Sequence, residues 1–133
     1  MTTHRADYAT VELQEHFGQN GESLSVPWAE FVGDEGEEHT FTVPTDDAVD
    51  PYLELQAYDV EEFGHEIRIN GVALSGFDIP PADGWQHWMD TLSGVSLAEG
   101  ENRIRIQRDT GTTDAFVVGV AVVHWREPVR PDG

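Results

Sequence analysis

Apolar and polar residues alternate with a period of two along most of this chain, and that pattern limits what it can fold into. Residues 52–58 are the clearest case, because Leu53, Leu55 and Ala57 alternate with larger or more polar neighbours. Successive side chains of a strand point to opposite faces of a sheet, whereas a helix needs a period of about 3.6. The chain is therefore predicted to be all-β.

Turn signals separate the alternating segments. Asn70-Gly71 lies between two of them, and Asn-Gly is the strongest short-range signal for a hairpin because its turn needs positive φ at both positions. The segments with strand character are 11–14, 23–26, 40–43, 52–58, 65–69, 72–74, 85–92, 103–108 and 116–125. This spacing predicts an antiparallel jelly-roll β-sandwich of eight to nine strands, with residues 1–133 as one domain and 128–133 as a loose tail.

Residues 116–125 are apolar on both faces of the expected strand. A strand of this kind is central in its sheet and covered twice. One cover is the sandwich core. The second could be an N-terminal strand, a loop or a neighbouring subunit, and the last of these would make the protein a homo- or hetero-oligomer.

Charge is the strongest compositional feature. There are 26 acidic residues against seven basic ones, all arginine, which gives a net charge of -19. The resulting repulsion opposes folding in dilute buffer but is screened in molar salt, where the Debye length falls to about 3 Å. We therefore predict a halophilic protein. Nucleic acid is excluded as a direct partner by the same charge.

The sequence shows no secretory signal and no apolar run near the roughly 18 residues of a membrane span. We expect synthesis in the cytoplasm without membrane insertion, and a final location in a virion or at the cell surface. Cysteine is absent, so thiol nucleophiles and thiolate metal sites are excluded.

Residues 51–125 resemble the galactose-binding-like jelly-roll modules. The likeness is carried by the strand at 53–59, the hairpin at 67–74, the strand with Trp85 and Trp88, the turn at 97–106 and the closing strand at 114–125. The chain is still more similar to small uncharacterised haloarchaeal proteins with this pattern. Such modules bind sugars through exposed aromatic residues and sometimes hold a structural calcium ion, but no residue here matches a calcium motif, so no cofactor is expected.

Trp85 and Trp88 are the candidate ligand-binding residues, together with Asp83, Gln86 and His87. An exposed tryptophan could stack on a sugar ring while the polar groups bind its hydroxyls. The alternative, which we prefer, is structural. Residues three apart point to opposite faces of a strand, so one tryptophan would lie in the core and the other would cover a sheet edge.

Arg103, Arg105 and Arg108 are candidate interface residues. They could bind carboxylates or an acidic neighbouring subunit. Equally, they could form a cross-strand ladder within the chain, with Glu54, Glu66 or Asp90 as partners.

No metal site is predicted. His65, His87 and His124 could gather with Asp59 or Asp114, but ordinary strand histidines are the preferred interpretation. The acidic turn at 34–38 and the pair at 46–47 could hold a hard cation, although a solvated acidic face explains them better.

No catalytic residues are assigned, because the chain lacks the motifs of nucleophile elbows, phosphate-binding loops and dinucleotide-binding loops. We expect a non-catalytic structural or binding protein, a component of a surface assembly such as a haloarchaeal virion. The alternative is a carbohydrate-binding module that recognises surface glycans.

Overall fold

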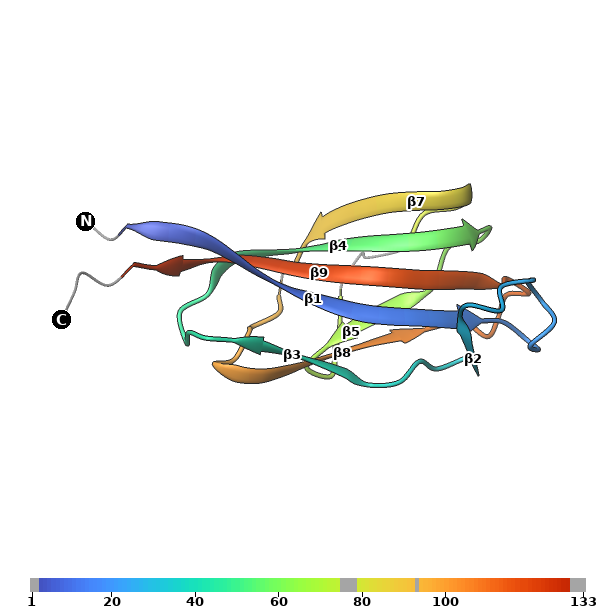
Figure 1. Ribbon diagram of the computed structural model, residues 1–133, viewed down its shortest axis with the longest axis horizontal. Coiled ribbons are helices and arrows are strands. Elements are labelled where there is room, and N and C mark those ends of the chain that lie inside the picture. Colours follow the sequence, from blue (N-terminus) through green and yellow to red (C-terminus); the bar gives the residue numbers. More distant parts are fainter. Residues whose placement is uncertain (1–2, 75–78, 93, 130–133) are drawn as a thin grey trace.

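A computed structural model of the protein describes residues 3–74, 79–92 and 94–129, and every regular element among them is a β-strand. The strands form two sheets that face each other across a shared interior (Figure 1). One has five strands in the order β2 (Glu30–Gly33), β1 (His4–Phe17), β9 (Phe116–Pro128), β4 (Val49–Val60) and β7 (Ala82–Thr91). The other has four, in the order β3 (His39–Val43), β8 (Gly100–Gln107), β5 (Glu66–Ile69) and β6 (Val72–Ala73).

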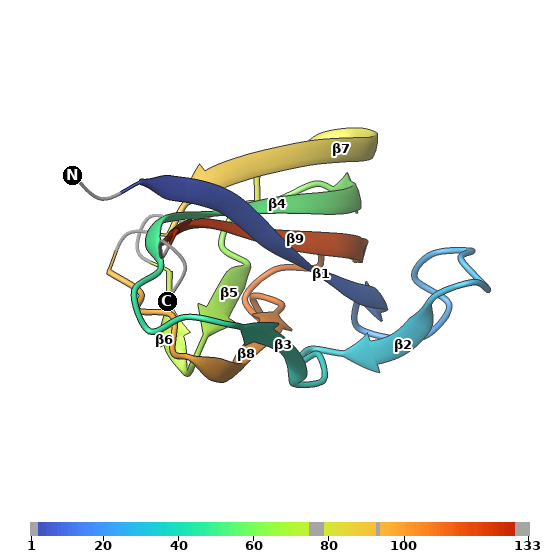
Figure 2. The same cartoon turned by 60° about the vertical axis from the view of Figure 1, so that its left-hand side comes forward.

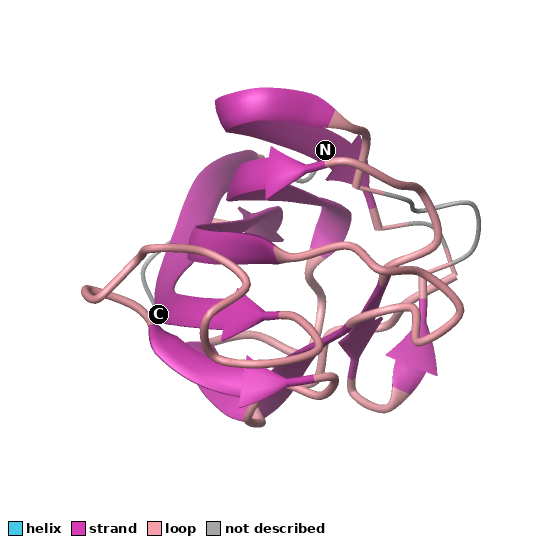
Figure 3. Cartoon of the chain, turned by 90° about the vertical axis from the view of Figure 1, so that its right-hand side faces the viewer, coloured by secondary structure: helices cyan, strands magenta, loops and turns pink. Residues whose placement is uncertain are grey.

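This arrangement confirms the prediction of an all-β sandwich of eight to nine strands. Figure 2 shows the two layers from a second direction, and Figure 3 shows strands joined by loops with no helix among the described residues. The described strand pairs are antiparallel, as expected, with the exception of β1 and β2, which run parallel. The described residues contain no helix long and apolar enough to cross a membrane.

The core lies between the sheets and is built from the inward positions of each alternating segment. On β4, Leu53, Leu55 and Ala57 are fully buried while Gln56 between them is exposed. They pack with fully buried residues from β5, β8 and β9, which are Ile67, Ile69, Ile104, Ile106, Phe116 and Val118. Burial of one such aliphatic side chain contributes about 1.5–3 kcal/mol, so this interior stabilises the sandwich without disulfides.

The predicted Asn70-Gly71 hairpin joins β5 to β6, with φ of 53° at Asn70 and 80° at Gly71. The Asn70 side chain also orders the turn before β8. Its Nδ2 donates to Oδ1 of Asn102 (2.9 Å), and its Oδ1 accepts the backbone N–H of Arg103 (2.9 Å). The hairpin and the turn at 97–102 therefore stabilise each other.

Two local expectations are wrong. Residues 23–26 form no strand, because Ser23 closes a turn through its Oγ bond to the Asn20 carbonyl (2.6 Å) and Pro27 cannot extend a ladder. β2 was not expected. Its four residues lie next to the acidic turn, and they form a strand because they pair with the C-terminal end of β1. Of the predicted tail at 128–133, Pro128 ends β9 and the Val129 N–H donates to the Thr3 carbonyl (2.7 Å), while 130–133 lie outside the described residues.

β9 lies between β1 and β4, as its doubly apolar sequence predicts. On its outer side, the Trp85 indole lies over Gly119, so a Cβ added there would be 3.2 Å from Trp85 Cζ3. Trp28, from the loop at 18–29, contacts the same indole. At this end of β9 the second cover therefore comes from the protein's own side chains, including one loop residue.

Candidate functional site

The outer face of the five-stranded sheet carries an aromatic cluster of Trp28, Tyr58 and Trp85. Tyr58 on β4 and Trp85 on β7 are directly opposite in the strand register, and their ring centroids lie 5.2 Å apart. Trp28 completes the cluster, with its ring centroid 5.5 Å from that of Trp85 and 6.4 Å from that of Tyr58. The three rings therefore meet although they come from three separate segments.

The two indoles of this cluster are half exposed, Trp28 at 50% and Trp85 at 52%. Burying large aromatic rings is favourable, so a cluster of them left in water commonly marks a binding surface. One side of the Trp85 ring lies over Gly119 of β9, where the absence of a side chain leaves room for it. The cluster thus offers a preorganised apolar surface rather than loose side chains.

Polar groups line the sheet beside the cluster. Gln56 on β4 lies opposite His87 on β7, and these two residues with Trp85 and Gln86 line a shallow pocket of about 350 Å³. Glu54, the next outward residue of β4, lies between two histidines, with its carboxylate 3.3 Å from His87 Nε2 and 3.4 Å from His124 Nε2. Amide, imidazole and carboxylate groups provide both the donors and the acceptors that a sugar hydroxyl uses.

A larger pocket of about 790 Å³ lies at the other end of β4 and β7. Its lining includes Tyr52, Met89 and Arg126, but Tyr52 is stacked on His124 at 4.4 Å and the pocket has no exposed tryptophan. Size alone favours this pocket. The aromatic cluster is the better candidate, because it combines exposed rings with hydrogen-bonding groups at one place.

The five predicted ligand-binding residues do not share one face. Trp85 and His87 point outward, whereas Trp88 lies opposite Leu55 and packs against the core. Gln86 donates from Nε2 to the Pro80 carbonyl (2.6 Å). Asp83 is exposed at the start of β7. Of the five, Trp85, Gln86 and His87 line the shallow pocket beside the aromatic cluster, and Asp83 and Trp88 do not.

Sequence reasoning missed Trp28, Tyr58, Gln56 and Glu54. A signal for the last three existed, since they occupy the outward positions of the segment at 52–58, opposite the strand with Trp85. Trp28 had no such signal, because it belongs to a loop of irregular structure and reaches the sheet only through tertiary packing.

The three candidate interface arginines are paired inside the chain. Arg103 contacts Glu38 (3.6 Å) and Glu101 (3.5 Å), while Arg105 contacts Glu35 (2.8 Å). The expected ladder partners were Glu54, Glu66 and Asp90. Among the described residues, none of them forms these ion pairs, and Glu66 pairs with Arg68 instead.

Arg108 is not a surface residue, contrary to its place among the interface candidates. It is 4% exposed, and its guanidinium binds Asp34 (2.8 Å) and the Thr112 carbonyl (2.8 Å). Its side chain turns inward at the end of β8, where it fixes the loop that leads into β9. The predicted arginine strip is thus reduced to Arg103 and Arg105.

The three candidate histidine ligands do not gather. His87 and His124 both face Glu54, whereas His65 is fully buried at the end of the sandwich, with Nε2 2.7 Å from Oδ2 of Asp114. His65 Nδ1 accepts the backbone N–H of Asp109 (3.0 Å), so Nε2 carries the proton that it donates to Asp114. Burial opposes ionisation of Asp114, but the bonds from His65 and from the backbone of Glu62 and Glu61 prevail and lower its pKa.

The fold defines a class: a single β-sandwich of two facing sheets. The fold resembles part of the GH26-CBM35 β-(1,4)-mannanase of Podospora anserina, with a TM-score of 0.52 and 14% identity over 95% of this chain and 28% of the mannanase. By its residues, the chain belongs to a family of unknown function, DUF7383, whose model matches residues 5–127.

Another similar structure is that of an uncharacterised protein of Listeria monocytogenes in complex with glucose, magnesium and calcium. It has a TM-score of 0.49 and 22% identity over 68% of this chain and 9% of that protein. No curated protein matches the sequence. The likeness to the mannanase shows the fold alone, and this chain spans less than a third of either neighbour.

Proposed function

We propose that this protein is a non-catalytic carbohydrate-binding module that binds glycans on the outer face of its five-stranded sheet. The observation that carries the proposal is the exposed aromatic cluster of Trp28, Tyr58 and Trp85 beside Gln56 and His87. A pyranose ring has an apolar C–H face that stacks on an indole and an equatorial rim of hydroxyls that needs hydrogen bonds. The cluster and its polar neighbours meet both requirements within one surface.

Charge favours a neutral glycan over an acidic one. The protein carries a net charge of -19, and Glu54 adds a carboxylate to the site itself. A uronate or sulfate group would be repelled there, since no arginine belongs to the aromatic cluster or lines the shallow pocket among the described residues. Neutral hexose polymers are thus the expected ligand class.

The assembly function predicted from the sequence stays a prediction. It depended partly on the need for a second cover over the apolar strand β9. Trp85 and the loop residue Trp28 supply cover at the Phe116 end of that strand from within the chain. A partner subunit is therefore not needed to explain that part of the sequence.

Binding to an array of neutral and acidic glycans in high-salt buffer tests the proposal. We expect wild-type protein to bind neutral glycans, and both Trp85→Ala and Trp28→Ala to lose that binding while keeping the β-sheet circular dichroism spectrum. Phe63→Ala is the matched control, because Phe63 is an aromatic residue of somewhat greater exposure (61%) that shares no ring contact with the cluster in the described chain. Wild-type protein that binds no glycan, or a Trp85→Ala variant that binds as well as wild type, would contradict the proposal.

A further inference from the structure

A glutamate lies buried at the edge of the sandwich, in a place where carboxylates are rarely found. Glu15 belongs to β1, is 1% exposed, and points towards β3 and the loop that precedes it. Its Oε2 accepts the backbone N–H of Glu37 (2.8 Å), but its buried Oε1 has no hydrogen-bond partner among the described protein atoms. A buried carboxylate oxygen without a partner is energetically costly, so this arrangement calls for a cation or a proton.

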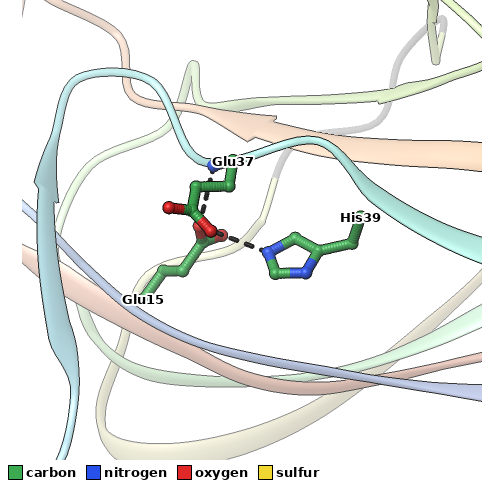
Figure 4. A group of neighbouring side chains, drawn as sticks. All are labelled: Glu15, Glu37 and His39. Atoms are coloured by element: carbon green, nitrogen blue, oxygen red, sulfur yellow. Dashed lines mark hydrogen bonds and ion pairs between the residues drawn. The ribbon is translucent and has the colours of Figure 1, made fainter.

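Two further potential ligands surround this carboxylate (Figure 4). His39, the first residue of β3, places Nε2 3.3 Å from Oε2 of Glu15, and this buried nitrogen also lacks a hydrogen-bond partner in the described chain. One ligand atom from each of Glu15, Glu37 and His39 can be chosen so that all three lie within 4.8 Å of one another. The group therefore joins β1, β3 and the loop between β2 and β3.

The ion pairs of that loop distinguish Glu37 from the other acidic residues of the loop. Three of its four acidic side chains are paired with arginines: Asp34 with Arg108, Glu35 with Arg105 and Glu38 with Arg103. Among the described residues, no arginine pairs with Glu37. Its carboxylate instead lies beside Glu15, where it adds a second negative charge with only an imidazole nearby.

The surroundings of the Glu15 carboxylate act on its pKa in opposite directions. Burial raises the pKa of Glu15, the Glu37 N–H and His39 lower it in part, and the Glu37 carboxylate raises it again. A divalent cation would reverse this balance, because it interacts favourably with both carboxylates at once.

We propose that Glu15, Glu37 and His39 form a binding site for a divalent metal ion of the zinc class. A mixed set of one imidazole and two carboxylates suits Zn²⁺, whereas Ca²⁺ takes six to eight oxygen ligands. Two ligands of a tetrahedral zinc ion with bonds of about 2.1 Å lie about 3.4 Å apart, close to the 3.3 Å between His39 Nε2 and Glu15 Oε2. A fourth position is left for water.

Gly36 makes room for the buried Glu15 carboxylate. A Cβ at this position would lie 2.7 Å from Oε1 of Glu15. Any larger residue would push the carboxylate out of its present position. The site is independent of the aromatic cluster, since Glu15 faces inward and the cluster lies on the outer face of the same sheet. We assign it a structural role, because it ties β1 to the start of β3.

Thermal unfolding and isothermal titration calorimetry of chelator-treated protein test this site, with ZnCl₂, CaCl₂ and MgCl₂ as the probes. We expect one tight zinc site per chain and a rise in Tm that grows with zinc concentration, as ligand binding to the native state requires. His39→Gln should weaken zinc binding by at least about 100-fold, since loss of even an outer-shell partner costs about 10–100-fold. Glu38→Gln is the matched control from the same loop and should bind zinc like wild type.

Glu15→Gln is expected to fold, because glutamine retains the acceptor for the Glu37 N–H. It therefore separates loss of zinc binding from loss of the fold. This variant should be folded by circular dichroism yet show no zinc-dependent rise in Tm. Co²⁺ gives a second readout, with visible absorption bands that should appear in wild type and disappear in His39→Gln. Preference for Ca²⁺ over Zn²⁺, equal zinc binding by all variants, or absence of a tight site in wild type would overturn the assignment.

Discussion

Trp85 rests on the backbone of Gly119, two strands away in the five-stranded sheet. Its Cζ3 and Cη2 would lie 3.2 and 3.3 Å from a Cβ at position 119, which is closer than ordinary van der Waals contact. The absence of a side chain at Gly119 therefore decides where the indole lies, and with it the shape of the aromatic cluster.

Replacing this glycine should impair binding without unfolding the protein. In Gly119→Val the isopropyl group would displace the Trp85 ring from its position over residue 119. We expect glycan affinity to fall about tenfold, equivalent to about 1.4 kcal/mol. Calorimetric titration with a glycan bound by wild type measures the effect. In the double variant with Trp85→Ala the glycine substitution should cause no further loss, because its effect acts through that ring. Additive losses would show that Gly119 acts by another route.

Asp114 should govern the stability of the sandwich end where the loops at 61–65 and 108–115 meet. Its carboxylate accepts bonds from His65 and from the backbone N–H groups of Glu61 and Glu62. Hydrogen bonds to a charged group are worth about 1.5–3 kcal/mol, so Asp114→Asn should lower the free energy of unfolding at pH 7 by about 2–3 kcal/mol. Urea unfolding measures this change.

The contribution of Asp114 to the free energy of unfolding should change with pH in a defined direction. The folded-state pKa of Asp114 is lowered below its usual value. The stability that it contributes is therefore fully present above the ordinary aspartate pKa of about 3.9 and is lost as the pH falls through the lowered folded value. Urea unfolding between pH 7 and pH 2 should show that the difference between wild type and Asp114→Asn shrinks in acid. A difference that grows in acid would contradict this account.

Salt should control folding of the whole chain. With a net charge of -19, self-repulsion is expected to unfold the protein at low ionic strength, where the Debye length is about 30 Å at 0.01 M. In molar salt the repulsion is screened and the fold should be stable. Circular dichroism during dialysis from 2–3 M to 0.01 M salt tests this, and an unchanged β-sheet spectrum at low salt would show that the acidic surface is tolerated without screening.

Much of the architecture could be predicted because its signals are local. The alternation at 52–58 depends only on the pleat of a strand, and the hairpin at Asn70-Gly71 only on the φ values that these residues accept. β2 could not be predicted, since its four residues are strand only through pairing with β1. The run at 23–26 had the right alternation but no partner strand, and it remains a loop.

The candidate site was only partly predictable. Trp85 was found, and the opposite directions of Trp85 and Trp88 follow from their spacing. The value of Trp85 as a ligand platform depends on Trp28 and Tyr58, which lie 57 and 27 positions earlier in the chain. Nothing in a single segment indicates which distant ring will be its neighbour.

By itself the sequence determined most of the strands, their inward faces, the hairpin and the central place of β9, because each depends on a residue and its immediate neighbours. Tertiary structure alone decided that Gly119 lies under Trp85 and that the buried Glu15 meets His39. Those contacts arise from the order in which strands pair and from how the two sheets face each other, and both depend on the free energy of the whole packed molecule rather than on local preference.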